Sequence, residues 1–184
     1  GRQDQYIAAY GGLRFIRFQP DGRVLLENVA LDDNGRRLLN QQLLLFYTNT
    51  GRKSESVLHE QRQNIQQRLA ELRNLKAMAF EGRRLLETGD FDSFGRLLHE
   101  SWLLKKSLAS KISNGTIDEI YARARQAGAL GGKVTGAGGG GYLLFFCPRE
   151  RQAALRQALQ PLPELAFHLE PYGSKIIFHY KPSG

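Results

Sequence analysis

Gly136-Ala137-Gly138-Gly139-Gly140-Gly141 is the stretch that decides the fold, and it precedes an apolar segment at 142–147. Because glycine has no Cβ, such a backbone can adopt positive φ and approach another chain or a phosphate closely. Successive N–H groups can then converge on an anion. Two standard phosphate-binding patterns are absent: the chain has no Gly-x-x-x-x-Gly-Lys-Ser/Thr, and the glycines precede a strand instead of a helix. On spacing alone, a tight connection without a ligand fits equally well.

The segments around this loop predict an α+β fold. Residues 13–18 and 23–31 have strand character and are separated by the turn signal Pro20-Asp21-Gly22, which indicates a hairpin. The apolar run at 42–48 predicts a strand buried on both faces. Helical periodicity or end signals occur at 54–88, from Asp90 onward, at 116–127 and at 148–160, and two further strands are expected near 166–170 and 175–180.

This order of elements predicts a largely antiparallel sheet of about four main strands covered by helices. We expect the loop at 131–141 to run between a helix and a central strand. The 184 residues suffice for one domain, or for one domain with a helical elaboration.

Composition restricts the cellular setting and the kinds of site. No apolar run approaches the roughly 20 residues that span a bilayer, and no signal-peptide pattern is present, so a cytoplasmic location is expected. Cys147 is the only cysteine and lies in an apolar segment, which predicts a buried thiol and excludes an internal disulfide. The four histidines lack metal-binding spacing, so no metal site is expected within the chain: His59, His99, His168 and His179.

The formal charge of +8 admits polyanionic partners. The basic residues are spread through the expected helices, which favours a solvated surface over one dedicated patch. Aromatic residues at strand spacing are core candidates, although aromatics interleaved with basic residues can also bind RNA: Phe145, Phe146, Phe178 and Tyr180. No RNA-binding signature accompanies them, so nucleic acid is the less favoured partner.

The segment at 128–141 closely resembles the third signature motif of the GHMP kinases, the superfamily of galactokinase, homoserine kinase and mevalonate kinase. The resemblance implies the ferredoxin-like carboxy-terminal domain of these enzymes. It also implies that Gly136, Ala137, Gly138, Gly139 and Gly140 help to shape the nucleotide site, with ATP and Mg²⁺ as cofactors. The main phosphate loop and a carboxylate for Mg²⁺ lie upstream in the family and are not in these residues.

Within the superfamily, residues 1–147 are most similar to the D-glycero-D-manno-heptose 7-phosphate kinases and related sugar kinases. The opening Gly1-Arg2-Gln3-Asp4-Gln5-Tyr6 resembles their Gly-x-x-Asp-Gln-Tyr segment. Trp102 with Lys105 and Lys106, and Ile112-Ser113-Asn114, also resemble that group. The chain begins at Gly1 without methionine, so we expect part of a longer protein, with residues 1–12 ending an amino-terminal kinase domain and 13–184 forming the carboxy-terminal domain.

The resemblance assigns roles to three residues outside the glycine loop. Asp4 matches the catalytic aspartate near the acceptor hydroxyl, although a bare Asp near a terminus is more often a cap or a solvated turn residue. Arg52 and Gly12 are candidates for substrate binding. Asn49 stands where the family usually has glycine, and this departure weakens the assignment of Arg52.

The predicted function is the carboxy-terminal portion of an ATP-dependent kinase that phosphorylates a sugar or sugar phosphate. D-glycero-D-manno-heptose 7-phosphate, phosphorylated at its anomeric hydroxyl, is the named candidate. The missing amino-terminal half is the expected partner, and without it the chain should turn over little. The alternatives are a non-catalytic basic module that binds nucleic acid and a regulatory module that has kept the kinase shape.

Overall fold

The computed structural model describes residues 2–49, 59–60, 62–136 and 138–178, and it divides the chain into two compact units. One unit comprises Gly1–Val29 with His168–Gly184, and the other comprises Ala30–Phe167. The boundary expected after residue 12 concerns the domains of a longer enzyme and stays a prediction.

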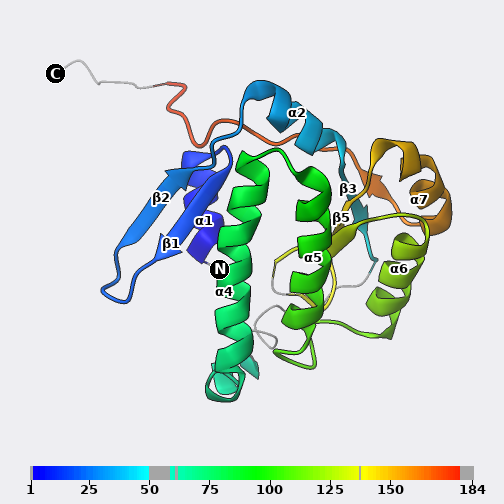
Figure 1. Cartoon of the computed structure of the whole chain (residues 1–184), viewed down its shortest axis with the longest axis horizontal. Coiled ribbons are helices and arrows are strands. Elements are labelled where there is room, and N and C mark those ends of the chain that lie inside the picture. The colour runs from blue at the N-terminus through cyan, green and yellow to red at the C-terminus, as the bar shows by residue number, and fades with distance from the viewer. Residues whose placement is uncertain (1, 50–58, 61, 137, 179–184) are drawn as a thin grey trace. The chain divides into compact units, whose positions relative to one another are not determined.

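The first unit contains one helix and a two-stranded hairpin (Figure 1). Helix α1 spans Arg2–Tyr10, and strands β1 (Arg14–Phe18) and β2 (Val24–Asn28) pair antiparallel. The N–H of Gln19 donates to the carbonyl of Arg23 at 2.9 Å and closes the turn. The predicted hairpin is therefore confirmed, whereas the helix at the start of the chain was not predicted.

The carboxy-terminal segment of the first unit runs beside helix α1. Gly12 N–H donates to the carbonyl of Glu170 at 2.9 Å, and Ser174 N–H donates to that of Ala8 at 3.1 Å. Within the described residues, 166–178 contain no strand, so the two strands expected there are wrong as far as the structure describes them. The apolar residues that suggested the last strand are exposed, Ile176 by 85% and Ile177 by 96%, because no neighbouring strand pairs with them.

The second unit is built on a sheet with the strand order β4-β5-β3-β6, in which all pairs are antiparallel. Strand β3 spans Leu43–Tyr47, β4 Gly131–Val134, β5 Tyr142–Phe146 and β6 Glu164–Leu165. Leu44 and Phe46 are buried, and the alternate residues Leu43, Leu45 and Tyr47 are only partly buried. The run at 42–48 is thus covered fully on one face, because side chains alternate along a strand, and the prediction of burial on both faces is wrong.

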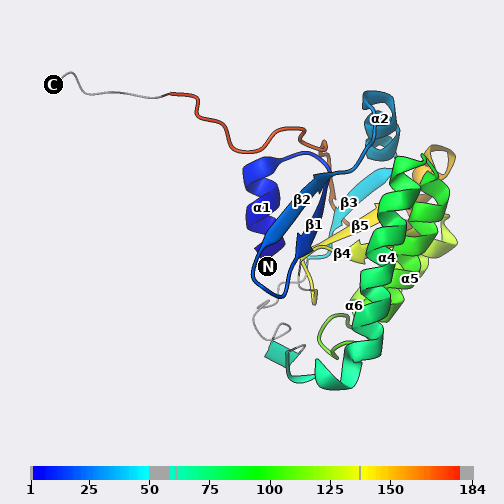
Figure 2. The same ribbon diagram turned by 60° about the vertical axis from the view of Figure 1, so that its left-hand side comes forward.

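Five helices of the second unit have described bounds: α2 (Asp33–Gln41), α4 (Leu69–Glu87), α5 (Phe91–Lys106), α6 (Gly115–Gln126) and α7 (Gln152–Leu159). Single 3₁₀ turns precede α4 at Gln66–Arg68 and α7 at Arg149–Arg151. Helices α4 and α5 lie side by side, and Figure 2 shows them on one face of the sheet.

The helix expected at 54–88 begins partly outside the described residues and is interrupted at Asn64 and Ile65. Ile65 and Leu69, which suggested a continuous apolar stripe, are about two-fifths exposed. Helix α2 was not predicted. Its start is fixed by Asp32, whose carboxylate accepts a hydrogen bond from Gly35 N–H at 2.6 Å, as expected for an N-cap.

One hydrophobic core joins the sheet to helices α5, α6 and α7. Its largest fully buried side chains are Trp102, Phe46 and Phe145. Phe46 and Phe145 come from neighbouring strands, and their ring centroids are 6.2 Å apart. The predicted combination of helices with a largely antiparallel sheet is confirmed.

Helix α5 and strand β4 approach until their backbones touch. A Cβ on Gly131 would lie 2.0 Å from the carbonyl oxygen of Gly95, and a Cβ on Gly95 would lie 2.6 Å from the ring of Phe146. Neither Gly95 nor Gly131 has a positive φ. Glycine is needed at both positions because the packing leaves no room for a Cβ atom. This contact sets the distance between the helix layer and the edge of the sheet.

Replacing Gly131 with alanine should destabilise the chain by about 2 kcal/mol or more, because the added methyl group meets backbone that cannot rotate away. The free energy of unfolding from urea titration measures the effect. Gly115→Ala is the matched control, since Gly115 begins a helix and has open space around its Cβ position. Equal stability of the two variants would show that the close approach does not constrain the fold.

Candidate phosphate-binding site

The glycine loop joins two paired strands. Residues 135–141 connect β4 to β5, and Thr135 N–H donates to the carbonyl of Tyr142 at 2.8 Å. The expectation of a helix-to-strand connection over 131–141 is therefore wrong in its first part. Gly131 and Gly132 belong to strand β4, which pairs with β5. Because these residues have no side chains, helix α5 can pack closely on Gly131 and strand β5 on Gly132.

The loop has positive φ at five described glycines: Gly136 (72°), Gly138 (109°), Gly139 (81°), Gly140 (158°) and Gly141 (86°). Residues with a Cβ adopt this region only with strain. The run of glycines thus specifies a backbone path that other residues would not hold. Successive backbone N–H groups of a glycine-rich loop can converge on an anion.

The middle of the loop rests on the turn that follows helix α5. Gly139 N–H donates to the carbonyl of Ile112 at 2.8 Å. A Cβ on Gly138 would lie 2.8 Å from the same carbonyl oxygen, so the loop approaches this turn as closely as glycine allows. Ile112 is itself fully buried, which makes the turn a firm support.

The two ends of the loop are held by groups from other elements. Thr48, which follows β3, donates to the carbonyl of Gly141 from both its N–H and its Oγ1, each at 2.8 Å. Lys105, in the last turn of α5, donates from Nζ to the carbonyl of Gly136 at 3.0 Å. The loop is therefore fixed at its start, middle and end.

The supporting turn is secured by polar contacts at the start of α6. Asn114 is the N-cap of α6, and its side chain accepts a hydrogen bond from Ile117 N–H at 3.0 Å. Asp118 accepts from Ser113 Oγ at 2.9 Å and pairs with Lys106 at 2.8 Å. These contacts give the sequence Ile112-Ser113-Asn114 a structural role beneath the loop.

Positive charge gathers at the start of the loop. Burial and, as a smaller cause, the positive charge of Lys133 on β4 together lower the pKa of Lys105 to about 8. Lys106, one residue along the helix, is paired with a carboxylate instead. The site therefore combines fixed backbone with cationic side chains, the components that bind phosphate.

The predicted site residues fall into three groups. Gly136, Gly138, Gly139 and Gly140 lie in the loop, whereas Ala137 and Arg52 lie outside the described residues. Asp4 is exposed in the first turn of α1, and Gly12 follows α1 with φ of 70°. Both belong to the first unit, whereas the loop belongs to the second. The catalytic role of Asp4 and the substrate roles of Arg52 and Gly12 stay predictions.

Reasoning from sequence assigned no role to Thr48, Lys105 or Lys133. A signal existed for Lys105, because the segment Trp102 to Lys106 was singled out as similar to sugar kinases. Thr48 is a small polar residue after an apolar strand, and nothing in its surroundings in the sequence points to the loop 93 residues away.

Buried groups elsewhere serve the core. The buried thiol of Cys147 was predicted correctly, and burial raises its pKa to about 11, which makes it a poor nucleophile. His99 Nδ1 lies 2.9 Å from the hydroxyl of Tyr121, as expected for a hydrogen-bonded histidine. Phe145 and Phe146 are fully buried and cannot stack on RNA bases, so that part of the alternative hypothesis is wrong.

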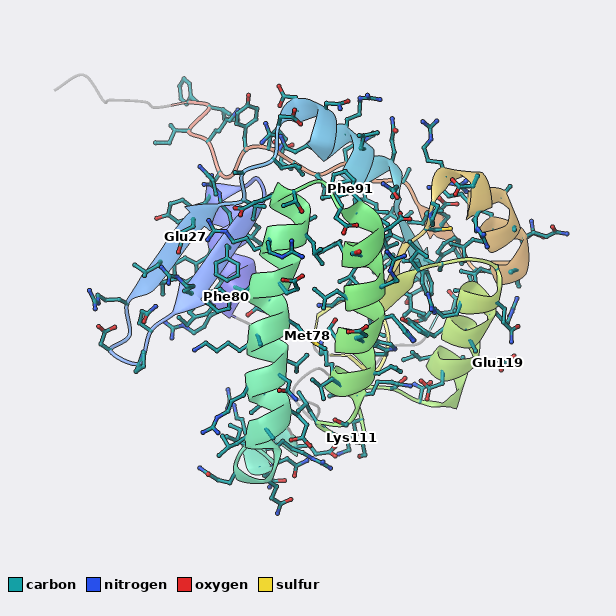
Figure 3. All side chains as sticks on the ribbon, viewed as in Figure 1. Glu27, Met78, Phe80, Phe91, Lys111 and Glu119 are labelled. Atoms are coloured by element: carbon teal, nitrogen blue, oxygen red, sulfur yellow. The ribbon has the colours of Figure 1, made fainter. Side chains whose placement is uncertain are left out.

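A separate apolar groove lies between helices α4 and α5. Its volume is about 670 Å³, and Met78, which Figure 3 shows between the two helices, lines it together with Leu103 and Leu104. Among the described residues, none of the glycine loop and no lysine or arginine borders this groove. It is therefore a poor candidate for a phosphate.

Two searches of the described residues gave negative results. None of the helices they form has the length and apolar character to cross a membrane. Nor do three or more His, Cys, Asp or Glu side chains from this part of the chain gather where they could hold a metal ion.

Comparisons with known proteins show which family this chain resembles. Residues 83–162 match the family model for the GHMP kinases C terminal domain. A D-glycero-alpha-D-manno-heptose 7-phosphate kinase of Campylobacter jejuni is 29% identical over 87% of this chain and 48% of its own length. A bifunctional fucokinase/GDP-fucose pyrophosphorylase of Arabidopsis thaliana is 30% identical over 96% of this chain and 17% of its own length.

A solved structure has the same fold. The D-glycero-D-manno-heptose 1-phosphate kinase from Bacteriodes thetaiotaomicron superposes with a TM-score of 0.70 over 97% of this chain and 50% of that protein, at 24% identity. The chain thus spans about half the length of the heptose kinases that it matches.

Gly138→Val should destabilise the chain by about 2–4 kcal/mol and weaken phosphate binding, because the new side chain combines strain at positive φ with a collision at the carbonyl of Ile112. Thermal unfolding and calorimetric titration with inorganic tripolyphosphate measure the two effects. Gly136→Val is the control, since Gly136 also has positive φ but has open space at its Cβ position. Equal losses of stability and of affinity in the two variants would show that glycine is needed at Gly138 only because of its positive φ, and not because of the contact with Ile112.

The depressed pKa of Lys105 predicts a pH-dependent contribution to stability. The amine of Lys105 has its ordinary pKa near 10.5 in the unfolded chain and a pKa of about 8 in the folded chain. Between these values the unfolded state holds more protons, so this residue makes stability rise with pH. Lys105→Met should abolish that rise.

The measurement is the difference in the free energy of unfolding between wild type and Lys105→Met, from about pH 7 to about pH 10.5. The difference should shift in favour of the wild type as pH rises through this window. Groups such as Cys147 titrate in both proteins, so the subtraction removes their contribution. A difference that stays constant with pH would contradict the predicted pKa.

Proposed function

Because the chain belongs to the GHMP kinase family through its carboxy-terminal domain, we propose that it is the carboxy-terminal portion of an ATP-dependent sugar or sugar-phosphate kinase. The observation that carries the proposal is the glycine loop, which is fixed at three points and has a lysine amine on its first carbonyl. Such a loop suits the negatively charged phosphates of a nucleotide.

The proposed substrate class follows from the relatives and from charge. The two curated relatives described above carry names of sugar-phosphorylating enzymes, and a basic chain with net charge +8 suits an anionic sugar. We propose D-glycero-D-manno-heptose 7-phosphate, phosphorylated at the anomeric hydroxyl, as the first substrate to test. The cytoplasmic location expected from the sequence belongs to the same proposal.

The reaction transfers the γ-phosphoryl group of ATP to a sugar hydroxyl. The hydroxyl oxygen forms a bond to the γ-phosphorus, the bond from that phosphorus to the β–γ bridging oxygen breaks, and ADP leaves with the electron pair. Asp4 would accept the hydroxyl proton. Catalysis of this kind depends chiefly on positioning and charge stabilisation, and the loop and its lysine would contribute both.

Mg²⁺ would neutralise charge on the phosphates when bound. The described residues hold no cluster of carboxylates or histidines that fits it. We therefore assign its ligands to an amino-terminal half of the enzyme, which is the proposed partner of this chain, and we derive no step through the metal. Alone, the 184-residue chain should show little turnover.

The two alternatives make different predictions. A nucleic-acid-binding module would bind an arbitrary oligonucleotide with an affinity that falls steeply with salt. A regulatory module would bind nucleotide without turnover even in the full-length protein. Both lack a role for the aspartate at the start of α1.

Asp4→Asn in the full-length protein should lower kcat by about 10²–10⁴-fold with the sugar phosphate while leaving ATP affinity nearly unchanged. The amide keeps the size of the side chain but cannot accept the proton. Steady-state kinetics and nucleotide titration give the two quantities.

Asp92→Asn is the control, because Asp92 also occupies the first turn of a helix and carries the same charge. It should retain near-normal kcat. Near-normal turnover of Asp4→Asn would rule out Asp4 as the base and leave acceleration to positioning and metal alone.

A further inference from the structure

Two side chains from a distant segment hold the turn at residues 107–112, which follows helix α5 and ends at the carbonyl that supports the glycine loop. Glu60 accepts a hydrogen bond at Oε1 from the N–H of Ser110 at 2.6 Å. Asn64 donates from Nδ2 to the carbonyl of Leu108 at 3.0 Å. Two backbone groups of the 107–112 turn are thus bonded to side chains that lie 50 and 44 residues away in the sequence.

Glu60 and Asn64 form one support because they are one helical turn apart. The N–H of Asn64 donates to the carbonyl of Glu60 at 3.1 Å, and residues with this spacing project to the same side of a helix. The N–H of Arg68 donates in turn to the carbonyl of Asn64 at 3.0 Å, and Arg68 is the residue before α4. The support is therefore continuous with the start of α4.

Both bonds to the 107–112 turn meet a need of the groups involved. The N–H of Ser110 is the main cause that lowers the pKa of Glu60, and the hydroxyl of Ser110 and the charge of Lys111 lower it as well. The carboxylate is therefore ionised at neutral pH, and ionised acceptors form stronger hydrogen bonds. Leu108 is buried, and Asn64 satisfies its carbonyl, which would otherwise lose hydrogen bonding on folding. Figure 3 shows Lys111 where the chain leaves α5.

A short backbone path connects this support to the glycine loop. The N–H of Ile112 donates to the carbonyl of Ala109 at 3.4 Å, between the two residues that Asn64 and Glu60 hold. The carbonyl of Ile112 accepts from Gly139 at 2.8 Å, and Gly138 has no room for a Cβ beside it. A displacement of the 107–112 turn would therefore move the loop with it.

We propose that Glu60 and Asn64 are positioning residues for the nucleotide, which they influence by fixing the 107–112 turn and, through Ile112, the path of the glycine loop. The inference deepens the proposed kinase function and rests on it for the identity of the ligand. Because the two side chains act through the loop, their loss should affect the nucleotide and leave the sugar unaffected.

The first experiment measures hydrogen exchange by mass spectrometry in the full-length protein. In Glu60→Ala, the amides at 138–141 should exchange about 10-fold faster than in wild type, because the bond between Gly139 and Ile112 opens more often. Exchange in β3 should stay unchanged, whereas a general loss of stability would accelerate both segments. Glu60→Gln keeps an oxygen that can accept from Ser110, so it should recover most of the protection.

The second experiment measures steady-state kinetics of the full-length protein with ATP and D-glycero-D-manno-heptose 7-phosphate. Glu60→Ala and Asn64→Asp should each raise the KM for ATP by about 3–10-fold and leave kcat and the KM for the sugar within roughly twofold of wild type. Asn64→Asp keeps the size of the side chain but replaces the donor amide with an acceptor. A role in stability alone would reduce the amount of folded enzyme and lower the apparent kcat without changing either KM.

Glu71→Ala is the matched control, since it removes the same charge from the first turn of α4, where Glu71 pairs with Arg68 at 2.9 Å. Its KM for ATP and its exchange at 138–141 should stay within roughly twofold of wild type. Asn64→Asp reaches the 107–112 turn through a separate bond, so it tests the inference even if Glu60→Ala does not fold. A KM for ATP at the wild-type value in the folded variants, equal rises of KM for both substrates, or equal acceleration of exchange at 138–141 and in β3 would overturn the inference.

The outcomes separate the inference from the proposed function. If the full-length protein phosphorylates the sugar while Glu60→Ala and Asn64→Asp keep the wild-type KM for ATP, the kinase stands and the positioning role does not. If the full-length protein has no kinase activity but Glu60→Ala accelerates exchange at 138–141 alone, the support of the loop stands and the kinase does not.

Discussion

The close approach of Gly131 to Gly95 is the constraint on which the rest of the second unit depends. From this point helix α5 and strand β4 both lead toward the glycine loop. Ten helical residues, from Gly95 to Lys105, rise about 15 Å. Strand β4 covers Gly131 to Val134, and the chain then turns through Thr135 and Gly136. At this turn the amine of Lys105 meets the carbonyl of Gly136.

Packing and charge act in opposite directions at this place. Phe146 of β5 packs against Phe94 and Gly95 of helix α5, and this packing holds Lys105 in partly buried surroundings. A flexible support would let the amine move into water. Stability from the core is therefore what allows the unfavourable burial of a charge to persist, as is common where a site is organised before its ligand arrives.

Much of the fold could be predicted from the sequence because it rests on local patterns. Apolar runs located β3 and β5, turn residues located the first hairpin, and the glycine loop identified the family. The failures have physical causes. Glycines at 131 and 132 suggested a loop, but they are strand residues selected for close packing. The apolar residues at 176–178 suggested a strand, but strand character produces a strand only where a partner is available. The site was predictable as a loop, whereas its anchors at Thr48 and Ile112 arise from contacts between distant segments.

The anchors of the glycine loop differ in how they respond to mutation. Most of the groups involved are backbone: the carbonyls of Ile112, Gly136 and Gly141 and the N–H groups of Gly139 and Thr48. Substitutions at Ile112 or Thr48 cannot delete these groups, although they can displace them. Among the described residues, the side-chain contributions are the Lys105 amine, the Thr48 hydroxyl and the Thr135 hydroxyl, which donates to the carbonyl of Tyr142 at 3.3 Å. Substitutions at the anchoring residues therefore leave most of the hydrogen bonds that fix the loop in place. The last turn of α5 can change without rebuilding the loop. Proteins with this fold could therefore differ in ligand preference through that turn.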